Sequence, residues 1–142
     1  MRLPHVVDLG SVTINPNSKR IAVAVIERGR QVLIGQRPEG VPLAGYWEFP
    51  GGKVEPDETY EAAVVRECLE ETGFEVEILD EFTPVEHTYQ HDVVAIRFFR
   101  CRVRNGDAVG EPHGAFQWVD RPSLVDYQFP DANAALIKEL VV

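Results

Sequence analysis

The stretch GGKVEPDETYEAAVVRECLEETGF, residues 51–74, decides how this chain is expected to fold. It opens with Gly51 and Gly52, which predict a turn, and a Pro-Asp pair that predicts a second turn follows. Thr59 is a suitable N-cap residue, and Gly73 is suited to end a helix. The stretch therefore predicts a loop followed by a helix over residues 60–72.

The predicted helix has an apolar side and a charged side. The apolar residues that share one stripe, and are expected to face a core, are Val65, Leu69, Ala62 and Cys68. On the other side, Glu67 lies three and four positions before Glu70 and Glu71, so the three carboxylates are expected to be surface neighbours. Ala63 is expected to leave room above them.

This clustering of acids works against the helix. Like charges four positions apart cost about 0.2–0.5 kcal/mol per pair. Acids in the last turn oppose the helix dipole by roughly 0.3–1 kcal/mol each. A solvated helix face is the usual explanation for a run of glutamates. Here the acids share one side and the unfavourable end, which favours a hard divalent cation, Mg²⁺ or Mn²⁺, bound to carboxylate oxygens.

The same stretch resembles the signature of the Nudix hydrolases, which cleave a nucleoside diphosphate linked to another moiety. The residues that match its fixed positions are Gly52, Glu58, Arg66, Glu67, Glu70, Glu71 and Gly73. Cys68 fills an apolar slot in which an aliphatic residue is more usual. The resemblance implies an α/β fold, namely an α/β/α sandwich with a central mixed β-sheet.

The resemblance also implies roles for the matching residues. Glu70 and Glu71 are expected to bind the metal ion, with the carbonyl of Gly51 as a further ligand. Glu67 is expected to be either a third ligand or the general base. Arg66 completes the expected catalytic set of Glu67, Glu70 and Arg66 by orienting one of the glutamates.

Two further segments leave alternatives open. Glu58 is either part of the site or a turn acid that interacts with the start of the helix. Family members often supply an acid or base from a loop before the last strand, and the resemblance implies that this loop is shorter here. Gln117 stands where relatives commonly carry an acid, so Glu111 and His113 are the nearest candidates, and neither is assigned a role.

A second resemblance, to the MutT-type branch of the family, concerns the substrate. It rests on Arg37, on residues 43–53 (LAGYWEFPGGK) and on residues 129–133 (FPDAN). Arg37 and Lys53 are candidates for phosphate contacts, and an exposed solubilising charge is the alternative for each. Phe49 is a candidate for the wall of a base pocket, and packing in the core is the alternative. Asn133 is expected to read the base, since its amide offers donors and an acceptor. The alternative is that Asn133 only caps the last helix.

Length and patterning outside the motif predict one domain. The 142 residues are enough for a single core. Strands are expected at residues 21–27, 31–36, 47–49, 75–79, 85–89, 93–103 and 116–119, and a closing helix at 131–141. Residues 21–142 are expected to form one Nudix domain. Residues 1–20 are expected to be an extension that adds a strand, covers an edge or takes part in a homodimer.

The composition limits the kinds of partner that the protein is expected to bind. The chain has 44% apolar and 26% charged residues, no apolar run of membrane-spanning length, and no signal-peptide pattern at its start. Two cysteines in expected core positions favour a reduced, cytoplasmic protein. The lack of a long apolar run favours a protein that does not use a membrane. The net charge of −9 argues against long nucleic acid as a partner and favours a nucleotide bound through metal and local cations.

These observations predict a metal-dependent enzyme that converts a nucleoside triphosphate, with oxidised dGTP among the candidates, to the monophosphate and pyrophosphate. One alternative is removal of pyrophosphate from the 5′ end of RNA, or cleavage of another nucleoside-diphosphate-linked compound. A second alternative is a non-catalytic nucleotide-binding module on the same fold. Such modules usually show a broken carboxylate set, and the set is complete here.

Overall fold

The computed structural model describes residues 7–9, 12–14, 19–89, 92–105 and 110–142. Its strands, in chain order, are β1 (Val7–Leu9), β2 (Val12–Ile14), β3 (Lys19–Arg28), β4 (Gln31–Gln36), β5 (Trp47–Glu48), β6 (Gly51–Lys53), β7 (Val76–Glu81), β8 (Val85–Tyr89), β9 (Asp92–Val103) and β10 (Phe116–Asp120). Its helices are α1 (Tyr60–Thr72), the 3₁₀ turns η2 (Arg121–Asp126) and η3 (Asp131–Asn133), and α2 (Ala134–Leu140).

The centre of the molecule is a mixed sheet in the order β10-β4-β3-β9-β7. The pair β3 and β9 is parallel, and the other pairs of this order are antiparallel. The short strands β5, β6 and β8 pair at the sides of β4, β3 and β9. Because β3 and β9 run in the same direction, their connection has to cross the sheet, and it does so through α1.

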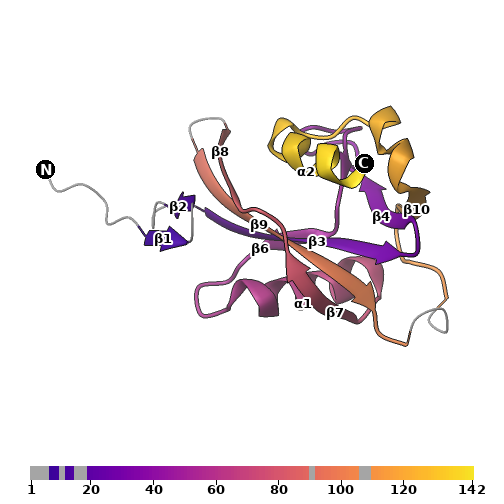
Figure 1. Cartoon of the computed structure of the whole chain (residues 1–142), viewed down its shortest axis with the longest axis horizontal. Coiled ribbons are helices and arrows are strands. Elements are labelled where there is room, and N and C mark those ends of the chain that lie inside the picture. The colour runs from indigo at the N-terminus through magenta and orange to yellow at the C-terminus, as the bar shows by residue number, and fades with distance from the viewer. Residues whose placement is uncertain (1–6, 10–11, 15–18, 90–91, 106–109) are drawn as a thin grey trace, which may run out of the picture.

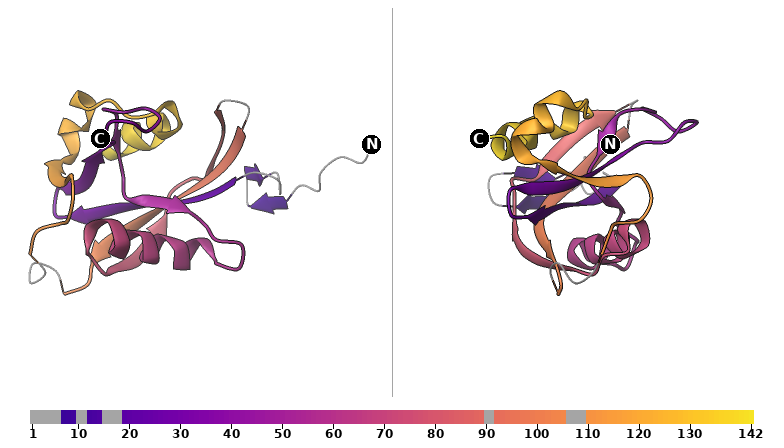
Figure 2. Two further views of the ribbon diagram at one scale, coloured as in Figure 1. Left: turned by 180° about the vertical axis from the view of Figure 1, so that it is seen from behind. Right: turned by 90° about the vertical axis from the view of Figure 1, so that its right-hand side faces the viewer.

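Helices cover both faces of this sheet. Figure 1 shows α1 on one face and α2, with the neighbouring 3₁₀ turns, on the opposite face. The views in Figure 2 show the same three layers from behind and from the side. The expected α/β/α sandwich around a mixed sheet is therefore confirmed.

Alternating side chains of β3 supply both cores. Ala22, Ala24 and Ile26 are fully buried on the face that carries α1. Val25 is fully buried in the second cluster, which packs against η2 and α2 through Leu124 and other apolar residues. This period of two is what a central strand buried on both faces requires. The two clusters hold α1 and the C-terminal segment in fixed positions on opposite sides of the sheet.

The N-terminal strands β1 and β2 form a separate two-stranded sheet. In Figures 1 and 2 this small sheet lies beyond the start of β3, away from the body of the fold. β3 itself begins at Lys19, two residues before the strand expected from the sequence. The division into an extension and a domain from residue 21 stays a prediction.

The predicted glycine turn is wrong. Gly51 and Gly52 lie in strand β6 and pair with Val23 and Ala22 of β3. A side chain at Gly51 would collide with the backbone of Ala22 and Val23, so the two strands approach more closely than most residues allow. Glycine is therefore needed at position 51 because two backbones approach closely. The sequence alone does not distinguish this need from that of a turn.

The predicted apolar side of the helix is also partly wrong. Ala62 is exposed and the Leu69 side chain is 54% exposed. The residues of α1 that are buried are Ala63, Val64, Cys68 and Thr72. The helix is rotated so that the row of residues 60, 64, 68 and 72 faces the core, and Ala63 packs there instead of leaving room above the acids.

Two smaller differences concern the C-terminal part. The expected helix over 131–141 is divided into η3 and α2, which ends at Leu140. The 3₁₀ turn η2, with Pro122 in its first turn, had no counterpart in the sequence prediction. Residues 90 and 91, between β8 and β9, and residues 106–109 lie outside the described residues.

Candidate active site

Helix α1 begins and ends where its caps predict. The Thr59 side chain accepts a hydrogen bond from the amide of Ala62 at 3.0 Å. Gly73 adopts a left-handed backbone, with φ of 79°, and its N–H donates to the carbonyl of Leu69. These two caps satisfy backbone groups that a helix end otherwise leaves unpaired, and they fix which turn carries the acids.

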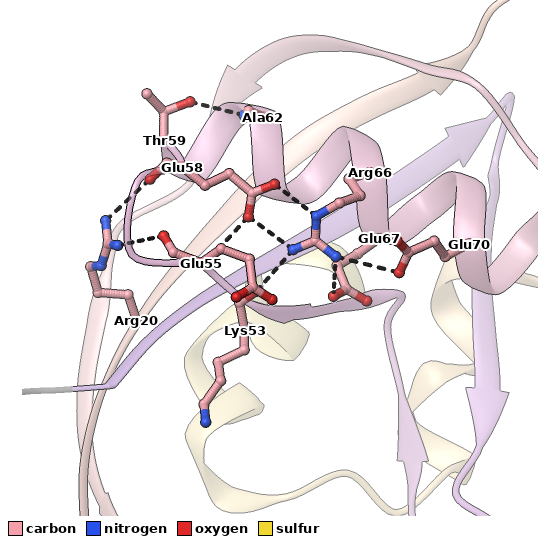
Figure 3. Close-up of polar contacts among 9 residues, drawn as sticks. All are labelled: Arg20, Lys53, Glu55, Glu58, Thr59, Ala62, Arg66, Glu67 and Glu70. Carbon is pink, nitrogen blue, oxygen red and sulfur yellow. Dashed lines mark hydrogen bonds and ion pairs between the residues drawn. The ribbon is translucent and has the colours of Figure 1, made fainter.

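Arg66 links three acidic side chains on α1 and the turn before it. Its guanidinium donates to both carboxylate oxygens of Glu58, at 2.7 Å and 2.9 Å. It also donates to Glu67 at 2.9 Å and to Glu70 at 3.3 Å, and to the carbonyl of Lys53 at 3.1 Å. Figure 3 shows this arrangement, with Arg66 between Glu58 and the two helix acids. One cation thus offsets much of the repulsion among the acids.

Glu58 is tied into this cluster and into its own turn. One of its oxygens accepts the amide of Glu55 at 3.0 Å. The hydrogen bonds from Arg66, followed by that from Glu55, lower the pKa of Glu58 from 4.5 to about 2. Glu58 therefore stabilises its own turn and fixes the position of Arg66, and its part in the site stays a prediction.

The glycines of β6 bring the backbone against the helix acids. A Cβ atom on Gly52 would lie 2.6 Å from the carboxyl carbon of Glu67, so any residue with a side chain here would displace the Glu67 carboxylate. The amide of Gly51 donates to Glu71 at 2.8 Å. The neighbouring ladder bonds, Ala24 to Pro50 and Val54 to Arg20, place Gly51 at a position not bonded to β3. Its carbonyl therefore points to the same edge as its amide, where Glu71 lies.

Glu71 is the electrostatically unusual acid of the set. Burial raises its pKa from 4.5 to about 7, although the hydrogen bond from Gly51 acts in the opposite direction. The negative charges of Glu67, Glu48 and Glu70 raise it further. A desolvated carboxylate among other carboxylates is stabilised in its charged form by a bound cation.

The donor set fits a hard divalent cation. It comprises the carboxylates of Glu67, Glu70 and Glu71 and the carbonyl of Gly51, all of them oxygen donors of the kind Mg²⁺ and Mn²⁺ prefer. Within the described residues, no three acidic, histidine or cysteine side chains converge closely enough to hold an ion. Arg66 holds Glu67 and Glu70, whereas Gly51 holds Glu71, so metal binding requires these side chains to turn toward a common point.

A cavity of about 320 Å³ adjoins this cluster. The residues that line it and bear on its chemistry are Arg37, Glu48, Phe49, Gly51, Gly52, Pro130, Ala132 and Asn133. They come from the end of β4, from β5 and β6, and from the segment around η3. The cavity thus joins the glycines beside the helix acids to a segment on the opposite face of the sheet.

Arg37 is held inside this cavity by fixed contacts. Its Nη1 donates to Glu48 at 2.8 Å and its Nε to the carbonyl of Pro42 at 2.8 Å. Its Nη2 has no protein partner among the described residues, which leaves two N–H groups for a phosphate. Phe49 stacks on Phe129 with ring centroids 5.1 Å apart, so it forms an apolar wall.

Asn133 also lines the cavity. Its Nδ2 donates to the carbonyl of Pro130 at 3.2 Å. Asn133 occupies the N-cap position of α2 but makes no capping hydrogen bond with its side chain. The structure therefore does not favour the capping alternative, and the carbonyl oxygen of the amide remains for a ligand.

Some expected residues lie elsewhere. Lys53 is exposed and its side chain extends away from the Arg66 cluster, so it does not line the cavity (Figure 3). In the loop before β10, the amide of His113 donates to the carbonyl of Thr72 at 2.9 Å. The imidazole of His113 covers Gly73, the residue that ends α1. Neither His113 nor Glu111 lines the cavity.

Glu48 is the cavity residue that the sequence analysis missed. It belongs to the WEFPGGK segment, but no role was assigned to it. The available signal was an acid within a short strand between Trp47 and Phe49, where a partly buried carboxylate needs a partner. That partner is Arg37, which was singled out for a different reason.

Comparisons with known proteins agree with this geometry. The family model described as "NUDIX domain" matches residues 22–139. The chain is 30% identical to the CTP pyrophosphohydrolase of Escherichia coli over 118 residues, 83% of this chain and 87% of that protein. It is 31% identical to the E. coli 8-oxo-dGTP diphosphatase over 122 residues, 85% of this chain and 95% of that protein.

A solved structure gives the same assignment. The MutT protein of Methanosarcina mazei superposes with a TM-score of 0.72 at 25% identity, covering 87% of this chain and 92% of that one. The chain belongs to the Nudix family, and it is a hydrolase with MutT-type relatives. No helix in the described part of the chain is long and apolar enough to cross a bilayer.

Proposed function

We propose that the protein hydrolyses a nucleoside triphosphate to the monophosphate and pyrophosphate with the help of a divalent metal ion, Mg²⁺ or Mn²⁺. One observation carries this proposal: Arg37, the pair Phe49 and Gly51, and Asn133 come from three separate stretches of sequence and line a single cavity beside the helix acids. Relatives named for CTP and for 8-oxo-dGTP support a triphosphate substrate.

Different residues bind the two ends of the substrate. The polyphosphate lies at the helix acids, where the free N–H groups of Arg37 bind oxygen atoms that a cation leaves unpaired. The base lies against Phe49, and the amide of Asn133 hydrogen-bonds to its edge. Glu67, Glu70 and Glu71, with the carbonyl of Gly51, hold the metal ion.

When bound, the metal ion supplies charge neutralisation and a more acidic attacking water. The protein's own part is orientation and proton transfer. Arg66 keeps Glu67 and Glu70 next to each other beside β6, and Glu58 and the carbonyl of Lys53 hold Arg66 in turn. Glu67 either completes the metal site or takes the proton of the attacking water. Burial of Glu71 strengthens its interaction with any bound cation.

A nucleotide panel tests the proposal. Purified protein with Mg²⁺ should convert at least one nucleoside triphosphate among CTP, dGTP, 8-oxo-dGTP and the other common triphosphates to monophosphate and pyrophosphate. Chelation of the metal with EDTA should abolish the reaction. Chromatography of the products distinguishes this outcome from release of inorganic phosphate. If triphosphates survive while 5′-triphosphorylated RNA or a diphosphate-linked compound is cleaved, the triphosphate proposal is wrong.

A further inference from the structure

The segment that leads into η3 is bound to β5 and to the residue before it. The N–H of Trp47 donates to the carbonyl of Gln128 at 2.8 Å, and the Gln128 side chain donates to the hydroxyl of Tyr46 at 3.1 Å. The rings of Trp47 and Tyr127 meet edge to face, with centroids 4.8 Å apart. We call these four residues the β5 contact. It joins parts of the chain that lie 82 positions apart in sequence.

The β5 contact lies between the two ends of the proposed site. On one side, the carbonyl of Tyr46 accepts a hydrogen bond from the amide of Arg37 at 2.8 Å. On the other side, Gln128 is followed along a short segment by Asn133. Arg37 and Asn133 both line the substrate cavity, whereas the four residues of the β5 contact lie outside its lining. The contact therefore connects the two ends without itself touching the space for a ligand.

The hydrogen bonds of η3 within the described residues are local. Asn133 donates to the carbonyl of Pro130 from its backbone at 3.0 Å and from its side chain at 3.2 Å. These bonds set the shape of η3 but not its place relative to β4 and Arg37. That place depends on apolar packing, such as the stacking of Phe129 on Phe49, and on the β5 contact next to it.

We propose that the β5 contact positions the substrate: it fixes the distance between Arg37 and Asn133, so that one nucleotide is held by its phosphates and its base at the same time. The inference rests on the proposed function, because it uses a nucleotide bound at both ends. Two groups held at a matching distance make the second binding event intramolecular, which raises affinity without a new contact. Loss of the β5 contact therefore weakens binding of a whole nucleotide and leaves binding of its phosphate part unchanged.

Tyr127 gives the first test, because its ring can be removed or kept. In Tyr127→Ala, KM for the best triphosphate should rise about three- to tenfold with little change in kcat. The Ki of inorganic tripolyphosphate, which has no base, should keep its wild-type value. The ratio of kcat/KM between the best and the poorest base should fall toward one. Tyr127→Phe should behave like the wild type, as should Val125→Ala, which shortens an exposed side chain nearby.

The hydrogen bond between Gln128 and Tyr46 gives a second test that leaves every packed ring in place. Gln128→Ala and Tyr46→Phe each remove this bond, so each should raise KM about twofold or more and leave the tripolyphosphate Ki unchanged. The double variant should be no weaker than either single variant, because both substitutions remove the same interaction. Circular dichroism confirms that each variant is folded.

Calorimetry with CMP, dGMP and 8-oxo-dGMP in EDTA separates this inference from the proposed function. Weaker binding of a monophosphate to Tyr127→Ala, restored in Tyr127→Phe, supports the β5 contact even if no triphosphate is hydrolysed. The inference is refuted if folded Tyr127→Ala and Gln128→Ala bind nucleotides as the wild type does. An equal rise in KM and in the tripolyphosphate Ki also refutes it, because the contact would then support the phosphate end alone. If the wild type binds no nucleotide, this inference and the proposed function both fail.

Discussion

Arg66 shows at the residue scale how several acids are accommodated around the end of one helix. Its five N–H groups contact Glu58, Glu67, Glu70 and the carbonyl of Lys53. The hydrogen bonds that Arg66 donates to Glu58, and then to Glu67, raise the pKa of its guanidinium further above the usual value. The sequence analysis predicted an orienting role for Arg66 but did not show that Glu58 would be its strongest partner. That pairing depends on how the 53–59 turn folds back, which residue spacing does not determine.

Glu58 gives the first prediction at this scale. Its pKa is lowered to about 2 in the folded state, so its contribution to stability is complete above its unfolded pKa of about 4.5 and is lost as the pH falls toward 2. The variant Glu58→Gln should therefore be less stable than the wild type near neutral pH, and the difference should shrink as the pH falls below about 4.5. Urea unfolding over a pH series measures it.

Glu39 provides a matched control for this measurement. It is an exposed acid for which no hydrogen bond or ion pair is found within the described residues. Glu39→Gln should follow the pH dependence of the wild type. If Glu58→Gln also does so, the pairing of Glu58 with Arg66 does not contribute to folding as described.

At the scale of elements, the site depends on how closely β6 lies between β3 and α1. The limits of α1 were predictable because Thr59 and Gly73 are local signals that act through the nearest backbone groups. The side of α1 that is buried was not predictable, because contact with β6 sets the orientation of the helix. Glu67 and Glu71 lie beside that strand, in the row next to the buried one. Only a glycine strand allows this packing, and glycine pairs in sequence indicate a turn as readily as a strand.

The two glycines of β6 should respond differently to the same substitution. Gly51→Ala places a methyl group against the backbone of Ala22 and Val23, which cannot move away, so it should destabilise the fold by about 1–3 kcal/mol. Gly52→Ala places it against the carboxylate of Glu67, a flexible side chain. It should leave the melting temperature almost unchanged but displace Glu67 and reduce metal-dependent turnover.

Thermal unfolding and turnover, measured on the same preparations, distinguish the two effects. The packing of β6 against Glu67 is contradicted if Gly52→Ala turns over substrate at the wild-type rate. Equal losses of melting temperature in both variants would likewise disagree with the different neighbours of the two glycines.

At the scale of the whole molecule, the site is assembled from both faces of the sheet. α1 on one face supplies the acids, and the η3 segment on the other supplies Asn133, so the proposed substrate cavity is lined by elements from both sides of the sheet. The sequence predicted the sandwich and the family because one local signature identifies both. The proximity of Arg37 to Asn133 followed only from resemblance, and Glu48 was missed because its partner is 11 positions away.

The central claim is that the acids of α1 bind the metal ion that makes hydrolysis possible, and Glu70→Gln tests it most directly. Glu70 is 59% exposed and its bond to Arg66 is long, so the substitution should change stability little. Turnover of the best triphosphate to monophosphate and pyrophosphate at saturating Mg²⁺ should fall at least about 100-fold. Calorimetry should show weaker Mn²⁺ binding. Wild-type turnover and Mn²⁺ affinity in a folded Glu70→Gln variant would contradict the account.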